Sequence, residues 1–281
     1  MTACSQCGSE GFHEIIEGET LCEQCFTEYT FDSIRSPHAN PALEFYGYSD
    51  NGRFYGFELE MMDGLNPSLM AGRLNYALPE IFTTRDGSVP GGFEMVTQPC
   101  TLKYHESMDY TRFFSLCENK GYKSHDASRS CGLHVHVSRI PQTHKHRGGQ
   151  LYLIHKFWNK FVKFSRRKGS DINQWAGMYQ CINIGDSFQS IYLKCQYESQ
   201  MGYQYRYRNI NLQNTATIEY RIFRGSLKRD TVIASIQFVD LLCEITGTLS
   251  ENEIRGLTWE DIKVRAGKYP ELKNYLKVRG L

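Results

Sequence analysis

Residues 54–61 read FYGFELEM, and polar and apolar side chains alternate along them. The apolar side chains fall on one side of such a run and Glu58 and Glu60 fall on the other, which is the pattern of a β-strand with one buried face. Two carboxylates about 7 Å apart on one strand face repel each other unless a cation lies beside them. The run therefore predicts a strand whose polar face either meets solvent or binds a cation.

Three later runs repeat this alternation and carry ionisable side chains on the polar face. They lie at 93–96, 131–138 and 217–224 and present Glu94, then His134 with His136, then Glu219 with Arg221. A fourth run at 203–208 carries Arg206 and Arg208 and leads into Asn211. Each run alone also fits a solvated strand face or a simple salt bridge. If the strands share one sheet, however, a single concave surface collects four carboxylates, two imidazoles and three guanidinium groups.

Helical periodicity occupies the segments between and after these runs. We expect helices at 68–78, 105–119, 148–168, 232–247 and 258–266 and from 271, together with a short strand at 81–84. In the helix over 148–168, Lys156, Lys160, Lys163 and Arg167 form a cationic stripe, which is either a solvated face or a docking track for an acidic partner. This order of elements predicts an α+β domain with a largely antiparallel sheet.

The first thirty residues form a separate unit in this interpretation. Two C-x2-C pairs, Cys4 with Cys7 and Cys22 with Cys25, are separated by fourteen residues and suit the four-sulfur shell of a structural Zn²⁺. A segment this short buries too little apolar surface to fold alone, so metal binding would supply most of its stability. We therefore expect a small zinc ribbon at 1–30, a linker at 31–51 and the large domain at 52–281.

Composition limits the function classes. The 281 residues are 41% hydrophobic and 22% charged, as in folded domains, and no run resembles a membrane span or a targeting segment. Residues 1–30 hold six of the 31 acidic residues and none of the 32 basic ones, so we expect the ribbon to repel nucleic acid and to dock a protein. Most of the ten cysteines are scattered singly, which favours reduced thiols in a cytoplasm.

The predicted concave surface has ligands suited to Mg²⁺ or Mn²⁺. Carboxylate oxygens with one imidazole are hard or borderline donors, and such ions neutralise phosphate oxygens during phosphoryl transfer. Neighbouring arginines are suited to bind the phosphates of ATP. The chain has neither a P-loop nor a dinucleotide-binding glycine motif, which argues against those two nucleotide-binding folds.

Four motifs occur together in one order. They are Gly56–Glu60, then Asp86–Ser88 with Gly92–Val96, then Gly132–Val137, then Arg208 and Asn211 followed by Thr217–Arg221. This set resembles the motifs of the amidoligases in the glutamine synthetase-like carboxylate-amine ligase superfamily, over roughly residues 50–245 and without the ribbon. The resemblance implies a glutamine synthetase-like sheet with helices on one side. It also implies an ATP-dependent ligase that forms an amide or isopeptide bond through an acyl phosphate.

Motif positions also imply roles for the acidic residues and one histidine. Glu58, His134 and Glu219 resemble the ligands of the metal ion beside the transferred phosphate. Glu60 and Glu94 resemble the ligands of a second ion, which by the resemblance is Mg²⁺ or Mn²⁺.

Further roles follow for the basic and amide side chains. Arg221 resembles the arginine that stabilises the transferring phosphoryl group. Arg208 and Asn211 resemble contacts to the nucleotide or substrate, and His136 and Arg206 are further candidates. The resemblance implies a small-molecule or peptide carboxylate and an amine as substrates, in the cytoplasm of a bacterium or a phage-infected host.

Two other interpretations fit parts of the sequence. A divalent-metal hydrolase would use the pair His134 and His136, although it would not need the arginine-rich segments from Arg206 to Arg221. A non-enzymatic adaptor would bind partners through the zinc ribbon and use the large domain as a scaffold.

Overall fold

The structure is a computed structural model, which describes residues 3–5, 7–11, 13–16, 19–29, 34–36, 41–87, 89, 91–125 and 131–281. Over these residues the chain forms an α+β arrangement with a mostly antiparallel mixed sheet, as predicted. The strand order in the main sheet is β3-β5-β6-β4-β7-β9-β8, and β3 with β5 is its parallel pair. The strand that carries Glu58 and Glu60 therefore lies in the middle of the sheet.

The strands have the following bounds. They are β1 His13–Ile16, β2 Glu19–Cys22, β3 Ile34–Arg35, β4 Tyr55–Met61, β5 Ile81–Thr84, β6 Phe93–Thr97, β7 Gly132–Ser138, β8 Ile210–Asn211 and β9 Thr217–Arg224. The expected strands at 54–61, 81–84, 93–96, 131–138 and 217–224 are confirmed to within two residues at each end.

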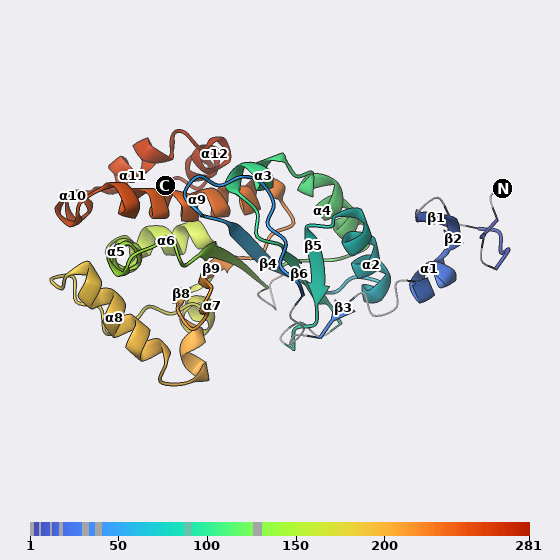
Figure 1. Ribbon diagram of the computed structural model, residues 1–281, viewed down its shortest axis with the longest axis horizontal. Helices are drawn as coiled ribbons and strands as arrows, with labels where there is room; N and C mark the ends of the chain where they lie inside the picture. Colours follow the sequence, from blue (N-terminus) through green and yellow to red (C-terminus); the bar gives the residue numbers. More distant parts are fainter. Residues whose placement is uncertain are drawn as a thin grey trace.

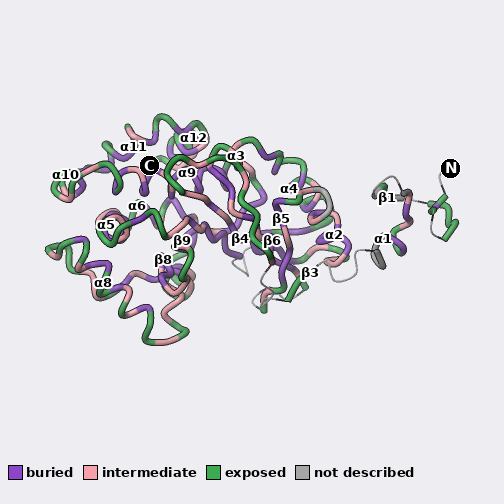
Figure 2. The backbone as a smooth tube through the Cα atoms, viewed as in Figure 1, coloured by how far each residue is buried: buried purple, intermediate pink, exposed green. Residues whose placement is uncertain are grey.

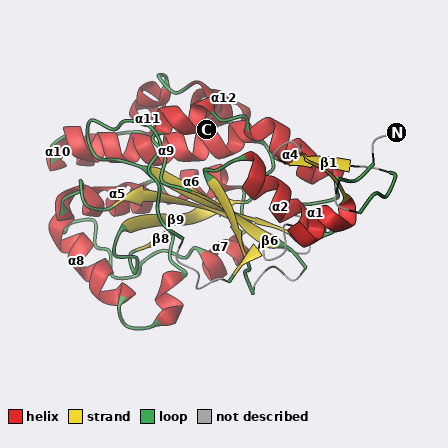
Figure 3. Ribbon diagram, turned by 45° about the vertical axis from the view of Figure 1, so that its right-hand side comes forward, coloured by secondary structure: helices red, strands yellow, loops and turns green. Residues whose placement is uncertain are grey.

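The helices are more numerous than the sequence predicted. They are α1 Glu23–Tyr29, α2 Pro67–Ala77, α3 Leu102–Ser107, α4 Tyr110–Asn119, α5 His144–Lys156, α6 Trp158–Ser165, α7 Gly169–Trp175, α8 Phe188–Ser199, the 3-10 helix η1 Tyr203–Arg206, α9 Arg229–Thr248, α10 Glu251–Gly256, α11 Trp259–Ala266 and α12 Pro270–Val278. In the views of Figures 1 and 3, α9 to α12 lie above the strands and α7 and α8 lie below them. The glutamine synthetase-like arrangement, with helices on one side of the sheet, stays a prediction.

The apolar face of the sheet forms the core. Phe57, Leu59, Leu133 and Val135 are fully buried, and buried residues gather along the central strands and the helices above them (Figure 2). The central helix of that layer, α9, packs against β7, α5 and α12. Among the described residues, α9 alone is long and apolar enough to cross a membrane, but 78% of its most apolar window is buried in the protein. Its hydropathy is therefore that of a core helix.

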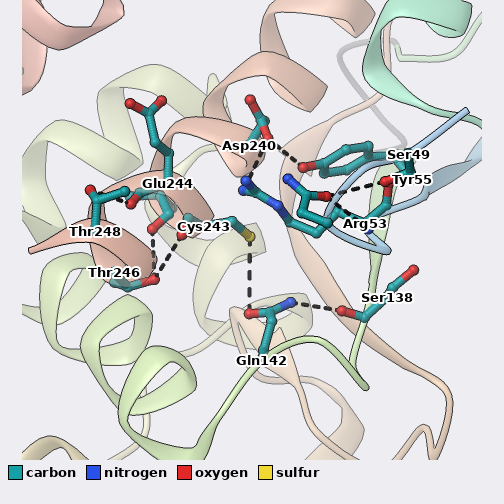
Figure 4. Close-up of polar contacts among 12 residues, drawn as sticks. Ser49, Arg53, Tyr55, Ser138, Gln142, Asp240, Cys243, Glu244, Thr246 and Thr248 are labelled. Atoms are coloured by element: carbon teal, nitrogen blue, oxygen red, sulfur yellow. Dashed lines mark hydrogen bonds and ion pairs between the residues drawn. The ribbon is translucent and has the colours of Figure 1, made fainter.

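A polar network fixes the edge of the core helix to the start of β4. Asp240 of α9 accepts hydrogen bonds from the hydroxyls of Tyr55 and Tyr269. It also forms an ion pair with Arg53 at 3.2 Å. Figure 4 shows Arg53 and Tyr55 converging on Asp240 from the sheet side. Asp240 is half-buried, and these partners compensate its charge. The network holds the first residues of β4 against the helix and so fixes where the strand's polar face begins.

Three sequence-based predictions were wrong in detail. The expected helix at 148–168 is divided at Phe157 into α5 and α6, and it ends at Ser165. The expected helix at 105–119 is divided into α3 and α4, because Asp109 caps the second helix by accepting a hydrogen bond from the backbone N–H of Arg112 at 3.3 Å. The expected strand at 203–208 is the 3-10 helix η1. There the Arg206 guanidinium lies 5.0 Å from the Tyr203 ring, a contact that i and i+3 side chains make in a 3-10 turn.

The sequence analysis did not predict the helices α7, α8 and α10. In α8 the hydroxyl of Ser187 caps the helix, but Leu193 and Tyr197 are exposed along it, so the apolar residues do not mark one clear face. The segment from Ile34 to Arg35, which falls in the predicted linker, pairs with β5 as β3.

The N-terminal unit packs against the large domain. The strands β1 and β2 form an antiparallel hairpin, and α1 follows at once (Figure 1). Phe26 of α1 lies in one apolar cluster with Leu69 of α2, and the guanidinium of Arg73 lies 5.8 Å from the Phe26 ring. Asn66 donates a hydrogen bond to Glu23 at 3.2 Å. The unit is thus seated on the first turns of α2.

His105 of α3 makes the stability of the fold depend on pH. Its ring is fully buried, with Nε2 3.0 Å from the carbonyl oxygen of Tyr55 and Nδ1 2.8 Å from the Tyr110 hydroxyl, and burial lowers its pKa from 6.5 to about 4. Between these values the unfolded chain binds a proton that the folded chain does not. Protonation of His105 alone should therefore lower the free energy of unfolding by about 1.4 kcal/mol for each unit that the pH falls below 6.5. The total loss at pH 4 should be about 3 kcal/mol.

Urea unfolding of wild type and His105→Gln between pH 7 and 4 measures this contribution. The variant should be less stable at pH 7, because it loses fitted hydrogen bonds, and the difference should shrink as the pH falls. A difference that stays constant over this range would contradict the assignment.

Candidate functional site

The register of the sheet brings the polar side chains together. Glu58 of β4 is paired with His134 of β7, and Glu60 of β4 is paired with Glu94 of β6. Since directly opposed residues point to the same face of a sheet, these four side chains share one surface. The three strands are separate segments of the sequence, yet their polar positions lie on one face.

The strand β9 adds Glu219 to this surface through an irregular pairing. His136 is paired with Glu219, but between the pairs Val135–Tyr220 and Leu133–Phe223 the strand β9 has one extra residue. Such a bulge turns the strand locally and is common beside functional sites. Arg221 lies in the bulge, and its guanidinium donates to the carboxylate of Glu219.

Two groups of potential metal ligands adjoin at His134. In one, the ligand atoms of Glu58, His134 and Glu219 lie within 4.8 Å of one another, and in the other the same holds for Glu60, Glu94 and His134. His134 Nδ1 lies 3.1 Å from a Glu58 oxygen and 3.6 Å from a Glu219 oxygen. All of these residues except Glu58 are buried, and Glu58 is half-buried. The structure thus brings together the five residues for which the sequence predicted metal binding.

The electrostatics of the site suit a divalent cation. Burial raises the pKa of Glu94 well above its ordinary value, and the charges of Glu58 and Glu60 raise it further. Burial would also raise the pKa of Glu58, but His136 and His134 outweigh it and hold that pKa well below the ordinary value. These carboxylates cannot all be ionised side by side at low cost without added positive charge. Carboxylate oxygens with a shared imidazole match the donors that Mg²⁺ or Mn²⁺ accepts.

Glu219 is held in its ionised form by several donors. Asn211 donates to one of its oxygens at 2.7 Å and Asn214 donates to the same oxygen at 3.2 Å. Burial acts to raise its pKa, but the charge of Arg221 outweighs burial, and the pKa is lowered. Asn211, which the sequence placed among the nucleotide or substrate contacts, therefore orients a carboxylate in this structure.

His136 and the other arginines are placed differently. His136 Nε2 lies 3.0 Å from a Glu58 oxygen and its Nδ1 lies 3.1 Å from the Thr217 hydroxyl, but among the described residues it belongs to neither group of potential ligands. Arg208 donates to Glu198 of α8 at 2.6 Å. Arg206 contacts the rings of Tyr203 and Tyr207. These contacts are with groups other than the carboxylates of the two groups of potential ligands.

Sequence reasoning missed Arg167. It was placed in a cationic stripe on a solvated helix face, but Arg167 is buried and its charge interacts with Glu60. Within the stripe, Lys156 donates to the carbonyl oxygens of Arg255 and Leu257, and Lys163 donates to that of Gly280. The sequence carries no signal for this difference, since Arg167 continues the i+4 spacing of the stripe.

Four cysteines form the predicted N-terminal cluster. The sulfur atoms of Cys4, Cys7, Cys22 and Cys25 all lie within 4.8 Å of one another, and those of Cys7 and Cys22 are 3.5 Å apart. The second pair lies at the start of α1, where the backbone N–H of Cys25 points to the sulfur of Cys22 at 3.5 Å. Four converging thiols fit the tetrahedral coordination of Zn²⁺.

Comparisons with known proteins add no family to this geometry. No family model matches the chain, and no curated protein matches it. We therefore infer the function from the residues of the site.

Replacing Cys25 with Ser should remove the metal of the N-terminal unit. Wild type purified without chelator should carry about one zinc per chain, because four thiolates complete the shell, and Cys25→Ser should carry far less. Inductively coupled plasma mass spectrometry measures the zinc content. Cys181→Ser, which changes a thiol outside the cluster, is the control and should retain the metal. Equal zinc in all three proteins would contradict the assignment.

Replacing Glu94 with Gln should separate metal binding from stability. In chelator the variant should melt at or above the wild-type temperature, because a neutral amide replaces a buried carboxyl whose ionisation burial and the charges of Glu58 and Glu60 oppose. Mn²⁺ at about 100 times its Kd should stabilise wild type by about 2.7 kcal/mol and stabilise the variant much less. Differential scanning calorimetry with and without Mn²⁺ measures both effects.

The matched control is Glu260→Gln, which neutralises an exposed carboxylate on α11. It should respond to Mn²⁺ as wild type does. A full Mn²⁺ response in Glu94→Gln would exclude Glu94 as a ligand.

Proposed function

We propose that the chain is an ATP-dependent carboxylate–amine ligase, an amidoligase, that forms an amide or isopeptide bond through an acyl phosphate. One observation carries the proposal. Two adjoining groups of ligand atoms share His134 on one face of the sheet, and arginine side chains border both of them. Adjacent cation sites with flanking guanidiniums suit phosphoryl transfer, which needs its charge neutralised at several oxygens at once.

Magnesium or manganese fits the carboxylate face. Glu58, His134 and Glu219 would hold one ion, and Glu60 and Glu94, next to the same histidine, would hold a second. When bound, such ions neutralise phosphate oxygens and polarise the phosphorus that is attacked. The protein's own contribution is to hold these donors in place before any substrate arrives.

The reaction has two steps. An oxygen of the substrate carboxylate attacks the terminal phosphorus of ATP, the bond to ADP breaks, and an acyl phosphate forms. The nitrogen of the amine then attacks the acyl carbon, phosphate leaves with the bonding electrons, and the departing phosphate takes up the proton that the amine loses. Arg221 would stabilise the charge on the transferring group, and Asn211 and Asn214 keep Glu219 oriented while it does so.

The burial of the site suits an intermediate that water destroys. Glu60, Glu94, His134, Glu219 and Arg221 are each less than 10% exposed. An acyl phosphate formed against this face would meet few water molecules, which favours attack by the bound amine. We propose Arg206 and Arg208 as contacts to the nucleotide or substrate.

The N-terminal cluster has a different role in this proposal. A zinc-bound unit with acidic residues and no lysine or arginine would be a docking module for a protein partner, and the reaction would take place in a cytoplasm. The hydrolase alternative is less well supported, because His136 belongs to neither group of potential ligands in the described residues.

An acyl-phosphate assay tests the proposed activity. The chain is incubated with ATP, Mg²⁺, pools of carboxylic acids and hydroxylamine, which takes the place of the amine and converts an acyl phosphate to a hydroxamate. We expect ADP, phosphate and hydroxamate in equal amounts with some acid pools. Glu58→Gln and Glu219→Gln should lower the rate by about 10²–10³-fold, the usual loss when one charge-stabilising group is removed from a site.

Glu260→Gln is again the control and should keep the wild-type rate. If calorimetry shows no binding of ATP with Mg²⁺ to wild type, the ligase proposal is wrong. Release of phosphate from phosphoesters without nucleotide would instead support the metal hydrolase.

A further inference from the structure

Two thiols are in contact beside α8, where the proposed reaction uses neither of them. The sulfur of Cys181 lies 3.7 Å from the sulfur of Cys195, which belongs to α8. The bond in a disulfide is about 2.0 Å long, so the two atoms must approach by about 1.7 Å to form one. Only a local adjustment therefore separates the two thiols from a disulfide.

Solvent reaches one thiol of this pair and not the other. The structure describes all six cysteines outside the N-terminal cluster, and Cys181 is the one among them that is not buried. Its partner Cys195 is completely buried, with 0% of the residue exposed. A small oxidant in solution therefore meets Cys181 first.

The two thiols also differ in acidity. A hydrogen bond from the Cys195 thiol lowers the pKa of Cys181, although burial and Glu198 act in the opposite direction. The pKa of Cys195 is raised, because its thiol donates that hydrogen bond and because it is buried. The thiolate is the reactive form of cysteine. Cys181 therefore has the properties of the attacking thiol, and Cys195 those of the thiol that reacts second.

We infer that Cys181 and Cys195 form a redox-active dithiol that hydrogen peroxide converts to a disulfide. In the first step the Cys181 sulfur attacks one peroxide oxygen, the O–O bond breaks, and the departing hydroxide takes up a proton and becomes water. This step leaves a sulfenic acid on Cys181. In the second step the Cys195 sulfur attacks the Cys181 sulfur, the S–O bond breaks, and the oxygen leaves as water with the proton of Cys195. Two thiols are oxidised, and one peroxide is reduced to two water molecules.

The disulfide connects two elements that hold Arg208. One is the segment that ends at Cys181, where the Arg208 guanidinium lies 5.7 Å from the Tyr179 ring. The other is α8, where Glu198 accepts a hydrogen bond from Arg208 at 2.6 Å. Cys195 precedes Glu198 by about one helical turn, so the new bond is close to this contact. Oxidation thus fastens the two supports of Arg208 to each other, with or without the ligase activity.

Peptide mapping detects the disulfide directly. Trypsin places Cys181 on peptide 169–194 and Cys195 on peptide 195–206, and it leaves all four cysteines of the N-terminal cluster on peptide 1–35. The full chain is treated with hydrogen peroxide, alkylated with iodoacetamide, digested without reductant and analysed by mass spectrometry. We expect the two peptides joined by a disulfide in the treated chain, and separate and alkylated after dithiothreitol.

Three alanine variants show whether the pairing is specific. Cys181→Ala and Cys195→Ala should abolish the joined peptides, whereas Cys117→Ala, which changes a buried thiol of α4, should form them as wild type does. If Cys195→Ala does not fold, the half-buried Cys181→Ala decides the result.

Thermal unfolding gives a second measurement. Peroxide-treated wild type should unfold about 5 °C above Cys181→Ala treated in the same way, because the cross-link restricts the unfolded chain. Dithiothreitol should remove this difference. The comparison with Cys181→Ala cancels any effect of peroxide on the N-terminal cluster.

Two outcomes overturn the inference. One is treated wild type in which both cysteines remain alkylated as free thiols. The other is a sulfenic or sulfinic acid on Cys181 beside an alkylated Cys195, since the second sulfur then does not reach the first. Neither outcome bears on the ligase proposal, which the hydroxamate assay tests separately.

Discussion

Several carboxylates are buried on one face of the sheet, and the rest of this structure must compensate the cost of burying them. Glu58, Glu60, Glu94 and Glu219 come from three strands and meet around His134. Their mutual repulsion opposes folding, so the surrounding elements must supply both rigid positions and positive charge. The central place of β4 provides the rigid positions, because its two neighbours in the sheet hold the partners of Glu58 and Glu60 in register. Arg221 and the histidines provide part of the positive charge.

The remaining charge imbalance links stability to function. A site that holds its donors close together without a cation has a higher free energy than an apolar face of the same size, and binding of a cation would recover part of this cost. The apolar side of the same strands provides the stability that offsets it, through α9 and the rings packed around it. The two faces of β4 thus have opposite effects on the free energy of folding, and each depends on the same alternation of side chains.

The sequence predicted the carboxylate face well because strand alternation has a fixed period of two. Once Glu58 and Glu60 lie on one face, the strand register decides whether Glu94 and His134 join them, and the motif order of the chain indicated that they would. The prediction of a strand failed where local side-chain contacts decided the backbone conformation. At 203–208 the alternating tyrosines and arginines stack at i+3 spacing in η1, which a period-two pattern does not reveal.

Arg167 shows why some site residues stay outside sequence reasoning. Its spacing from Lys163 is that of a solvated helix face, and only the end of α6 at Ser165 turns its side chain inward. That turn depends on the left-handed backbone conformation of Arg166, which an arginine does not favour. The side chain of Arg167 also needs the space left by the missing Cβ of Gly132, thirty-five residues earlier in the chain. The space that Arg167 fills is therefore made by a different element. A site built in this way joins residues whose positions are related in the folded chain and not by any spacing in the sequence.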